Sequence, residues 1–175
     1  MTHKERLLTA VNHEEPDRVP ICAWYTPEAE KKVLRRLGVE SEEFEIPDFS
    51  RPDRYDGARQ MMDQYGEEYG IMGGLACTLF ELAWYLLGWI EAARVKRDFG
   101  DRLTLWGTVD IQEVLPFGTP EDVAQEVKLR VRTAGQGGGL ILSPAHNIQP
   151  EVPLENILAF YSAAKQYGRY PISAA

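Results

Sequence analysis

The last third of the sequence predicts an α/β fold in which helices surround a parallel sheet. Two apolar stretches, LTLWG at 103–107 and LIL at 140–142, are typical of strands, and a helical segment follows each of them. Strand, helix, strand and helix in this order form βα units, which build a sheet of parallel strands. Valines recur at every fourth position of the helix predicted between the two strands: Val123, Val127 and Val131.

Capping residues mark the beginnings of the helices. Thr2 and Glu5 have the spacing of a capping box, which predicts a helix over 3–12. Thr26-Pro27-Glu28 begins another helix, because it combines an N-cap, a proline in the first helical position and an early acidic residue. The remaining predicted elements are helices at 53–65, 77–87, 91–99, 119–134 and 153–167, strands at 18–25 and 69–73, and an acidic linker at 39–53.

Composition excludes several classes of protein. The chain has 175 residues, of which 44% are hydrophobic, so it is long and apolar enough for one folded domain. Its net charge of -8 argues against nucleic-acid binding, which needs a basic face. The start of the chain is polar, and the longest apolar run, at 75–90, is too short to span a bilayer. We therefore expect a cytoplasmic domain with a small-molecule substrate and no membrane or nucleic-acid partner.

Polar side chains follow both predicted strands. Asp110 lies in the loop after the first strand, and His146 lies in the loop after the second. Because neighbouring parallel strands lie about 5 Å apart and end at one edge, we expect Asp110 and His146 to converge on one small ligand. A carboxylate can orient a histidine, and a histidine transfers protons near neutral pH. The alternative is structural, with Asp110 capping a helix and His146 binding a backbone carbonyl.

Other side chains near these strand ends are candidates for substrate binding: Trp24, Trp106, Gln112 and Asn147. Trp24 has the alternative of packing in the core. His13 follows an exposed helix, so we expect it to be solvated. The glycines at 137–139 precede a strand rather than a helix, which predicts a tight turn and not a phosphate-binding loop.

Three stretches of the sequence resemble one known family. They are KERLLTAVNHEEPDRVPI near the start, GGLACTLFELAWYLLG in the middle, and the long segment from FGDRLTLWGTVDIQEVLPFG to LILSPAHNIQPEVPLENI. They are similar to the uroporphyrinogen decarboxylase-like family, which also includes cobalamin-linked methyltransferases. The resemblance implies a (β/α)₈ barrel, which takes about 250 residues. A chain of 175 residues then implies a partial barrel, with one domain over 1–175 and sequence missing near 45–46 and 90–93.

The resemblance also implies roles for the two candidate catalytic residues. His146 matches the family's histidine after the last strand, and Asp110 matches an acidic position after the preceding strand. In a decarboxylase, Asp110 would stabilise a pyrrole cation, while His146 would position the substrate or shuttle a proton, with no cofactor. The stretch PICAWYTPEAEKK departs from the decarboxylase pattern, because it lacks the arginines that hold substrate carboxylates.

Two alternatives to a decarboxylase follow from the same resemblance. A methyltransferase relative would need zinc and a corrinoid partner, but the sequence has no His-x-Cys pair to bind zinc. A non-catalytic, shortened remnant of the family is the other alternative. Because the few predicted strands cannot close a barrel, we expect the chain to form a homo-oligomer through its open sheet edges or to be marginally stable.

Overall fold

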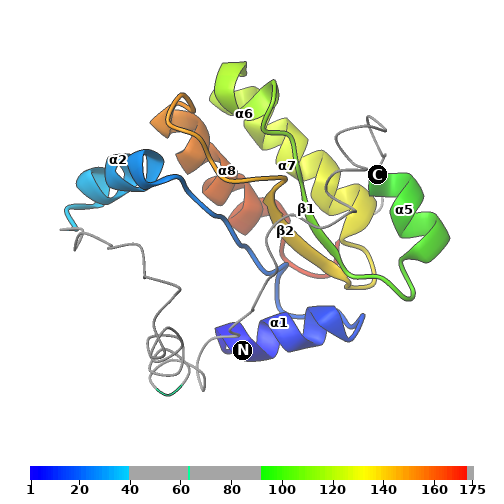
Figure 1. The fold of residues 1–175 in the computed structure, drawn as a ribbon. Helices are drawn as coiled ribbons and strands as arrows, with labels where there is room; N and C mark the ends of the chain where they lie inside the picture. Colours follow the sequence, from blue (N-terminus) through cyan, green and yellow to red (C-terminus); the bar gives the residue numbers. More distant parts are fainter. Residues whose placement is uncertain (40–62, 64–91, 173–175) are drawn as a thin grey trace, which may run out of the picture.

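The computed structural model describes residues 1–39, 63 and 92–172 (Figure 1). The elements are α1 (His3–Val11), α2 (Pro27–Leu37), α5 (Ala92–Phe99), β1 (Leu105–Val109), α6 (Val114–Phe117), α7 (Pro120–Ala134), β2 (Leu140–Pro144) and α8 (Leu154–Tyr167). The elements predicted at 53–65, 69–73 and 77–87 lie outside the described residues, Asp63 excepted, as does nearly all of the linker.

The two strands β1 and β2 form a parallel pair, as the sequence predicts. Leu105 lies opposite Leu140, and Val109 lies opposite Pro144. The strand β1 begins and ends two residues later than predicted, since the predicted loop residues Thr108 and Val109 still pair with β2. The α/β class with a parallel sheet is therefore confirmed.

The N-terminal segment 18–25 lies along the other edge of β2. The Leu142 N–H donates to the Pro20 carbonyl at 2.9 Å, and the Cys22 N–H donates to the Leu142 carbonyl at 3.0 Å. Farther along, the Ile148 N–H donates to the Trp24 carbonyl at 2.8 Å. The segment predicted as a strand thus forms isolated bridges rather than a continuous ladder. It nevertheless places Trp24 beside Trp106 of β1 and beside the loop after β2.

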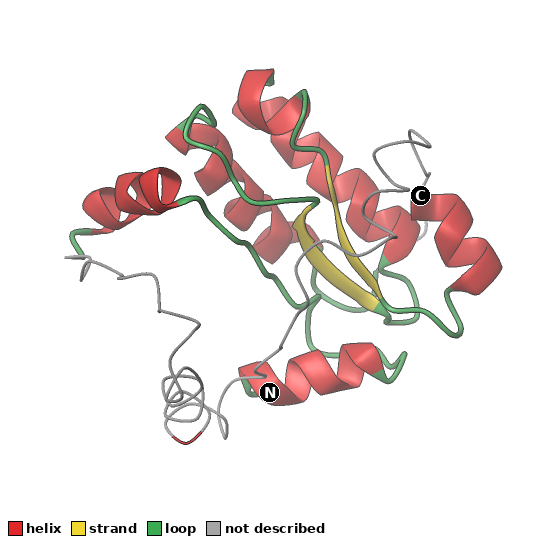
Figure 2. Cartoon of the chain, viewed as in Figure 1, coloured by secondary structure: helices red, strands yellow, loops and turns green. Residues whose placement is uncertain are grey.

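The helices α7 and α8 cover one face of the strands and form the core with them (Figure 2). The predicted valine stripe of α7 is fully buried, and Phe160 of α8 is also 0% exposed. Burial of one such apolar side chain stabilises the fold by about 1.5–3 kcal/mol. The helix α7 begins with a capping box between Thr119 and Asp122, and the box predicted for Thr2 and Glu5 is also present.

The glycine turn before β2 packs against the end of α1. Gly137, Gly138 and Gly139 have φ angles of 69°, 80° and 70°, a region that favours glycine. A Cβ on Gly138 would collide with the Glu14 carbonyl oxygen, so the close approach also requires glycine. The turn is confirmed, but His13 is half-buried against Gly139 rather than solvated, and its Nδ1 is a buried atom without a hydrogen bond.

An ion pair joins α1 to the segment that follows it. Arg6 Nε donates to Asp17 Oδ1 at 2.6 Å, and Arg6 Nη2 donates to Asp17 Oδ2 at 2.8 Å. The hydrogen bond from Arg6 lowers the pKa of Asp17 from 3.8 to about 2. Because the folded-state pKa is depressed, the pair stabilises the fold fully above about pH 4 and loses this effect as the pH falls through about 2.

We expect the Asp17→Asn variant to lose this acid-dependent part of the stability. The Asp17 side chain is 45% exposed, so solvent screening limits the contribution to about 1 kcal/mol in the free energy of unfolding. Urea unfolding at pH 6, 4 and 2.5 measures the difference, with Asp101→Asn as the control because the Asp101 side chain is 80% exposed. Equal pH dependence in wild type and Asp17→Asn would contradict the expectation.

Candidate functional site

The parallel pairing brings the loops that carry Asp110 and His146 to the same edge of the sheet. The Ala145 N–H donates to the Val109 carbonyl at 2.9 Å, so contact between the chains continues one residue beyond the last strand pair. Asp110 directly follows Val109, and His146 directly follows Ala145. The sequence rule for parallel strands therefore places the two loops correctly, and a ligand pocket shared by both side chains stays a prediction.

Asp110 holds the turn that leads into α6. Its Oδ1 accepts from the Gln112 N–H at 2.9 Å, and its Oδ2 accepts from the N–H groups of Glu113 and Val114 at 3.1 and 3.0 Å. The structural alternative is thus present, since the carboxylate organises the backbone before a helix. These hydrogen bonds also fix the carboxylate in place, as a catalytic group requires.

The sequence analysis did not predict the helix α6. An aspartate whose carboxylate accepts hydrogen bonds from the backbone N–H groups two to four residues later is nevertheless a known turn signal. The helix has four residues and contains Pro116, which hides its periodicity. Asn156 of α8 holds the far end of α6, because its Nδ2 donates to the carbonyls of Leu115 and Gly118, both at 2.8 Å. The Asp110 loop is thereby tied to the core.

His146 is exposed in the loop after β2, and Asn147 beside it is half-buried. The Gln112 side chain is exposed in the turn that Asp110 organises. Gln149 Nε2 donates to the Asn147 carbonyl at 3.5 Å, a long hydrogen bond within the same loop. All three predicted polar residues thus lie just beyond the carboxyl ends of β1 and β2.

Trp24 and Trp106 pack edge to face, with ring centroids 5.2 Å apart and an interplanar angle of 84°. Their exposed fractions are 57% and 43%, so the alternative that Trp24 lies in the core is wrong. Cys22 lies next to this pair: burial raises the pKa of its thiol, while a hydrogen bond with Trp106 partly offsets the rise. The two rings form an accessible aromatic surface, which we call the tryptophan pair.

A tyrosine pair also joins the N-terminal segment to α8. The hydroxyl oxygens of Tyr25 and Tyr161 lie 2.7 Å apart, and burial raises the pKa of both groups. Sequence reasoning missed this contact, because the two residues lie 136 positions apart and no local pattern relates them. The pair secures the segment that carries Trp24 against the last helix.

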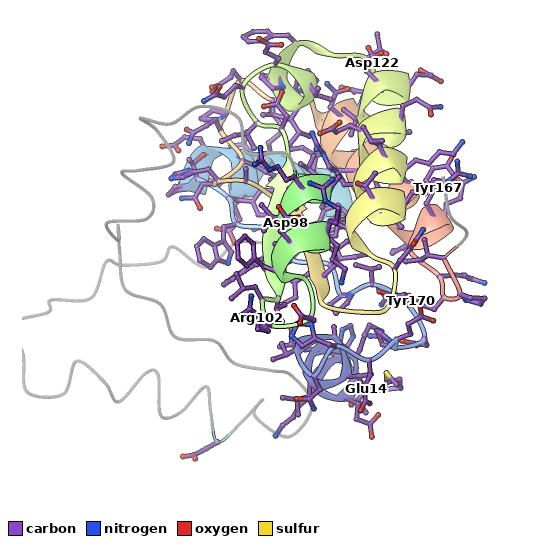
Figure 3. The ribbon with its side chains drawn as sticks, turned by 90° about the vertical axis from the view of Figure 1, so that its right-hand side faces the viewer. Glu14, Asp98, Arg102, Asp122, Tyr167 and Tyr170 are labelled. Atoms are coloured by element: carbon purple, nitrogen blue, oxygen red, sulfur yellow. The ribbon has the colours of Figure 1, made fainter. Side chains whose placement is uncertain are left out.

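A hollow of about 480 Å³ lies between α6 and α7, beside the turn that Asp110 organises. Its lining residues are Glu113, Val114, Phe117, Gly118, Asp122, Gln125, Glu126 and Leu129. Figure 3 shows Asp122 at the start of α7, at the opposite end of the molecule from Glu14. Neither Asp110 nor His146 lines this hollow, but Glu113 and Val114, whose N–H groups donate to Asp110, do.

Within residues 1–39, 63 and 92–172, no three His, Cys, Asp or Glu side chains gather closely enough to hold a metal ion. The zinc of the methyltransferase alternative therefore has no ligand set in this part of the chain. Of the helices described, none is both long and apolar enough to cross a bilayer.

Comparison with known proteins identifies the family. The family model described as Uroporphyrinogen decarboxylase (URO-D) matches residues 69–167. The chain is 31% identical to the uroporphyrinogen decarboxylase of Serratia proteamaculans over 60% of its own length and 28% of the relative. It is 35% identical to that of Psychromonas ingrahamii over 58% and 27% of the two chains, and 29% identical to that of Pseudoalteromonas translucida over 65% and 31%.

These matches span less than a third of each relative's length. The family resemblance implies a (β/α)₈ barrel, and the described residues contain two parallel strands with covering helices, the kind of unit from which such a barrel is built. The family model covers more than half of the chain and includes both strands, both candidate loops and the helices that support them. The chain therefore belongs to the uroporphyrinogen decarboxylase family.

Proposed function

We propose that the chain acts as a carboxy-lyase on a porphyrinogen-type or related substrate. The observation that carries the proposal is the placement of Asp110 and His146 on adjacent loops at the carboxyl ends of two parallel strands. In barrel enzymes this end of the strands holds the active site. The curated relatives named uroporphyrinogen decarboxylase support the same chemistry.

Decarboxylation of a pyrrole acetate needs three proton transfers, two gains and one loss, and a stabilised cation. A proton adds to a ring carbon and makes the pyrrole cationic; loss of CO₂ then returns the electron pair of the broken bond to the ring. A proton then adds to the exocyclic methylene carbon, and the proton on the ring carbon is lost. The product carries a methyl group in place of the acetate. The carboxylate of Asp110 would stabilise the cation, and His146 would position the substrate or carry a proton.

The remaining candidates would bind the substrate around this pair. The tryptophan pair offers an apolar surface to pyrrole rings, with about half of each indole exposed. Gln112 and Asn147 lie in the two loops that carry the catalytic candidates, and their amides can bind polar substituents. We include no cofactor in this proposal.

The second candidate function is a non-catalytic member of the family. The stretch PICAWYTPEAEKK lacks the arginines that hold substrate carboxylates in the decarboxylase pattern, and the sequence has no His-x-Cys pair, which favours this reading. The test incubates the purified chain with uroporphyrinogen under reducing conditions and measures released CO₂ and decarboxylated porphyrinogen. A separate incubation with a methylated corrinoid and a thiol acceptor tests the methyltransferase alternative. Product in the first assay supports the proposal, and its absence refutes it.

We also propose that the chain is one domain over 1–175, shortened near 45–46 and 90–93, that associates with itself through open sheet edges. Within the described residues β1 pairs with β2 alone, so its other edge has no strand partner there. Pairing of such edges between copies would satisfy their backbone groups. Light scattering that shows a monomer with a high, cooperative melting temperature would refute this proposal.

A further inference from the structure

Thr108 has an unusual backbone conformation in β1. Its φ angle is 89°, and the preceding Gly107 has a φ of 114°. Glycine tolerates this region, but a residue branched at Cβ rarely adopts it because the side chain crowds the backbone. The conformation is therefore strained at Thr108, and strained residues in folded proteins concentrate at functional sites.

The Thr108 hydroxyl is also an anomaly. Its Oγ1 is buried and makes no hydrogen bond. The residue opposite in the parallel ladder is Ser143, whose hydroxyl is engaged with the Pro144 carbonyl at 2.8 Å. A buried hydroxyl without a partner lowers stability, so valine of nearly the same shape would be the more stable choice. Within the described residues, the Thr108 hydroxyl thus has no hydrogen-bond partner.

The position of Thr108 in β1 relates its backbone conformation and its unpaired hydroxyl to the candidate site. Along β1 the buried residues Gly107 and Val109 alternate with the more exposed Trp106 and Thr108. Thr108 stands between Trp106 and Asp110 along the chain, two residues from each, and lies opposite Ser143 of β2. A hydroxyl that has no partner loses no hydrogen bond when it rotates toward a ligand held between these residues.

We propose that the Thr108 hydroxyl anchors the ligand by donating a hydrogen bond to a carboxylate borne on an aromatic ring, while the tryptophan pair contacts the ring. This inference rests on the proposed function and names a further residue of the same site. The Thr108 hydroxyl is a neutral hydrogen-bond donor. It is suited to bind one carboxylate of the substrate while another carboxylate of the same substrate leaves as CO₂. The strain keeps the hydroxyl near the strand end, where Asp110 begins the catalytic loop.

The test compares three variants by calorimetric titration with uroporphyrinogen under anaerobic, reducing conditions. Thr108→Val removes only the hydroxyl, and we expect about 10- to 100-fold weaker binding with an equal or higher melting temperature. Thr108→Ser keeps the hydroxyl and should bind within about threefold of wild type. Thr108→Gly relieves the backbone strain, so its melting temperature should rise by about a few degrees, as for a single stabilising substitution. Its binding should weaken, because the hydroxyl is lost.

The control is Thr104→Val, since the Thr104 hydroxyl donates to the Val11 carbonyl at 3.4 Å, away from the strand ends. If Thr108→Val binds uroporphyrinogen within threefold of the wild-type affinity, the inference is overturned and the proposed function still stands. Failure of wild type itself to bind uroporphyrinogen would refute the proposed function, and the inference with it. A fall in the melting temperature of both Thr108→Val and Thr108→Gly would assign Thr108 a structural role and also overturn the inference.

Discussion

Replacement of Asp110 with asparagine is expected to lower kcat for uroporphyrinogen decarboxylation by about 10²- to 10⁴-fold, the range that proton transfer and charge stabilisation by one side chain supply. An amide carries no negative charge, so it cannot stabilise a pyrrole cation. Its oxygen can still accept hydrogen bonds from the turn before α6, where the carboxylate now accepts from Gln112, Glu113 and Val114. The fold should therefore survive, and stability should fall by at most about 2 kcal/mol.

The matched control for this variant is Asp122→Asn. Asp122 also organises a helix start, because its Oδ2 accepts from the N–H and the hydroxyl of Thr119 at 2.8 and 2.7 Å. It lies at the beginning of α7 (Figure 3) and so reports the loss of capping without loss of the candidate catalytic charge. Steady-state kinetics and urea unfolding on both variants separate the two roles of Asp110. Equal losses of kcat in the two variants would leave Asp110 with a structural role alone.

Replacement of Asn156 with leucine is expected to lower the free energy of unfolding by about 2–4 kcal/mol. The Asn156 side chain is 1% exposed, and its Nδ2 donates to the carbonyls of Leu115 and Gly118. Leucine has a similar size but no donor, so two hydrogen bonds are lost and both carbonyls lack this partner, one of them fully buried. Because these bonds hold α6 to α8, the loop that Asp110 organises should also become less ordered.

Urea unfolding measures the loss, with Asn12→Leu as the control. Asn12 is exposed at the end of α1, so its replacement should change the free energy of unfolding by less than about 0.5 kcal/mol. Amide hydrogen exchange of Leu115 and Phe117 reports on α6 directly, and exchange should accelerate in Asn156→Leu. An Asn156→Leu variant no less stable than Asn12→Leu would show that the two hydrogen bonds contribute little.

Local signals in the sequence predict the elements whose stability is itself local. The helix predicted at 119–134 from its valine stripe is present as α7, Pro120–Ala134. The strand predicted at 103–107 lies two residues later, at Leu105–Val109, since the Gly107 φ of 114° lets the chain continue beside β2. The four-residue α6 depends on a local signal, the turn at Asp110, and on a distant one, Asn156, which lies 46 positions after Asp110, so a window of sequence shows only the first.

The candidate site also contains features that the sequence predicts and features that it does not. A general rule of parallel sheets predicts that the loops of Asp110 and His146 are neighbours, and the structure confirms their placement. Contacts between distant segments could not be predicted, since the Trp24–Trp106 pair and the Tyr25–Tyr161 pair form only when residues 18–25 lie along β2. The strain at Thr108 arises from backbone geometry that residue types do not encode.

A double-mutant cycle tests most directly whether Asp110 and His146 serve a single site. It measures kcat for uroporphyrinogen decarboxylation in wild type, Asp110→Asn, His146→Gln and the double variant. If the two side chains act together on one substrate, the double variant should be little slower than the slower single variant. A double variant whose loss equals the product of the two single losses, or single variants with unchanged kcat, would contradict a shared site.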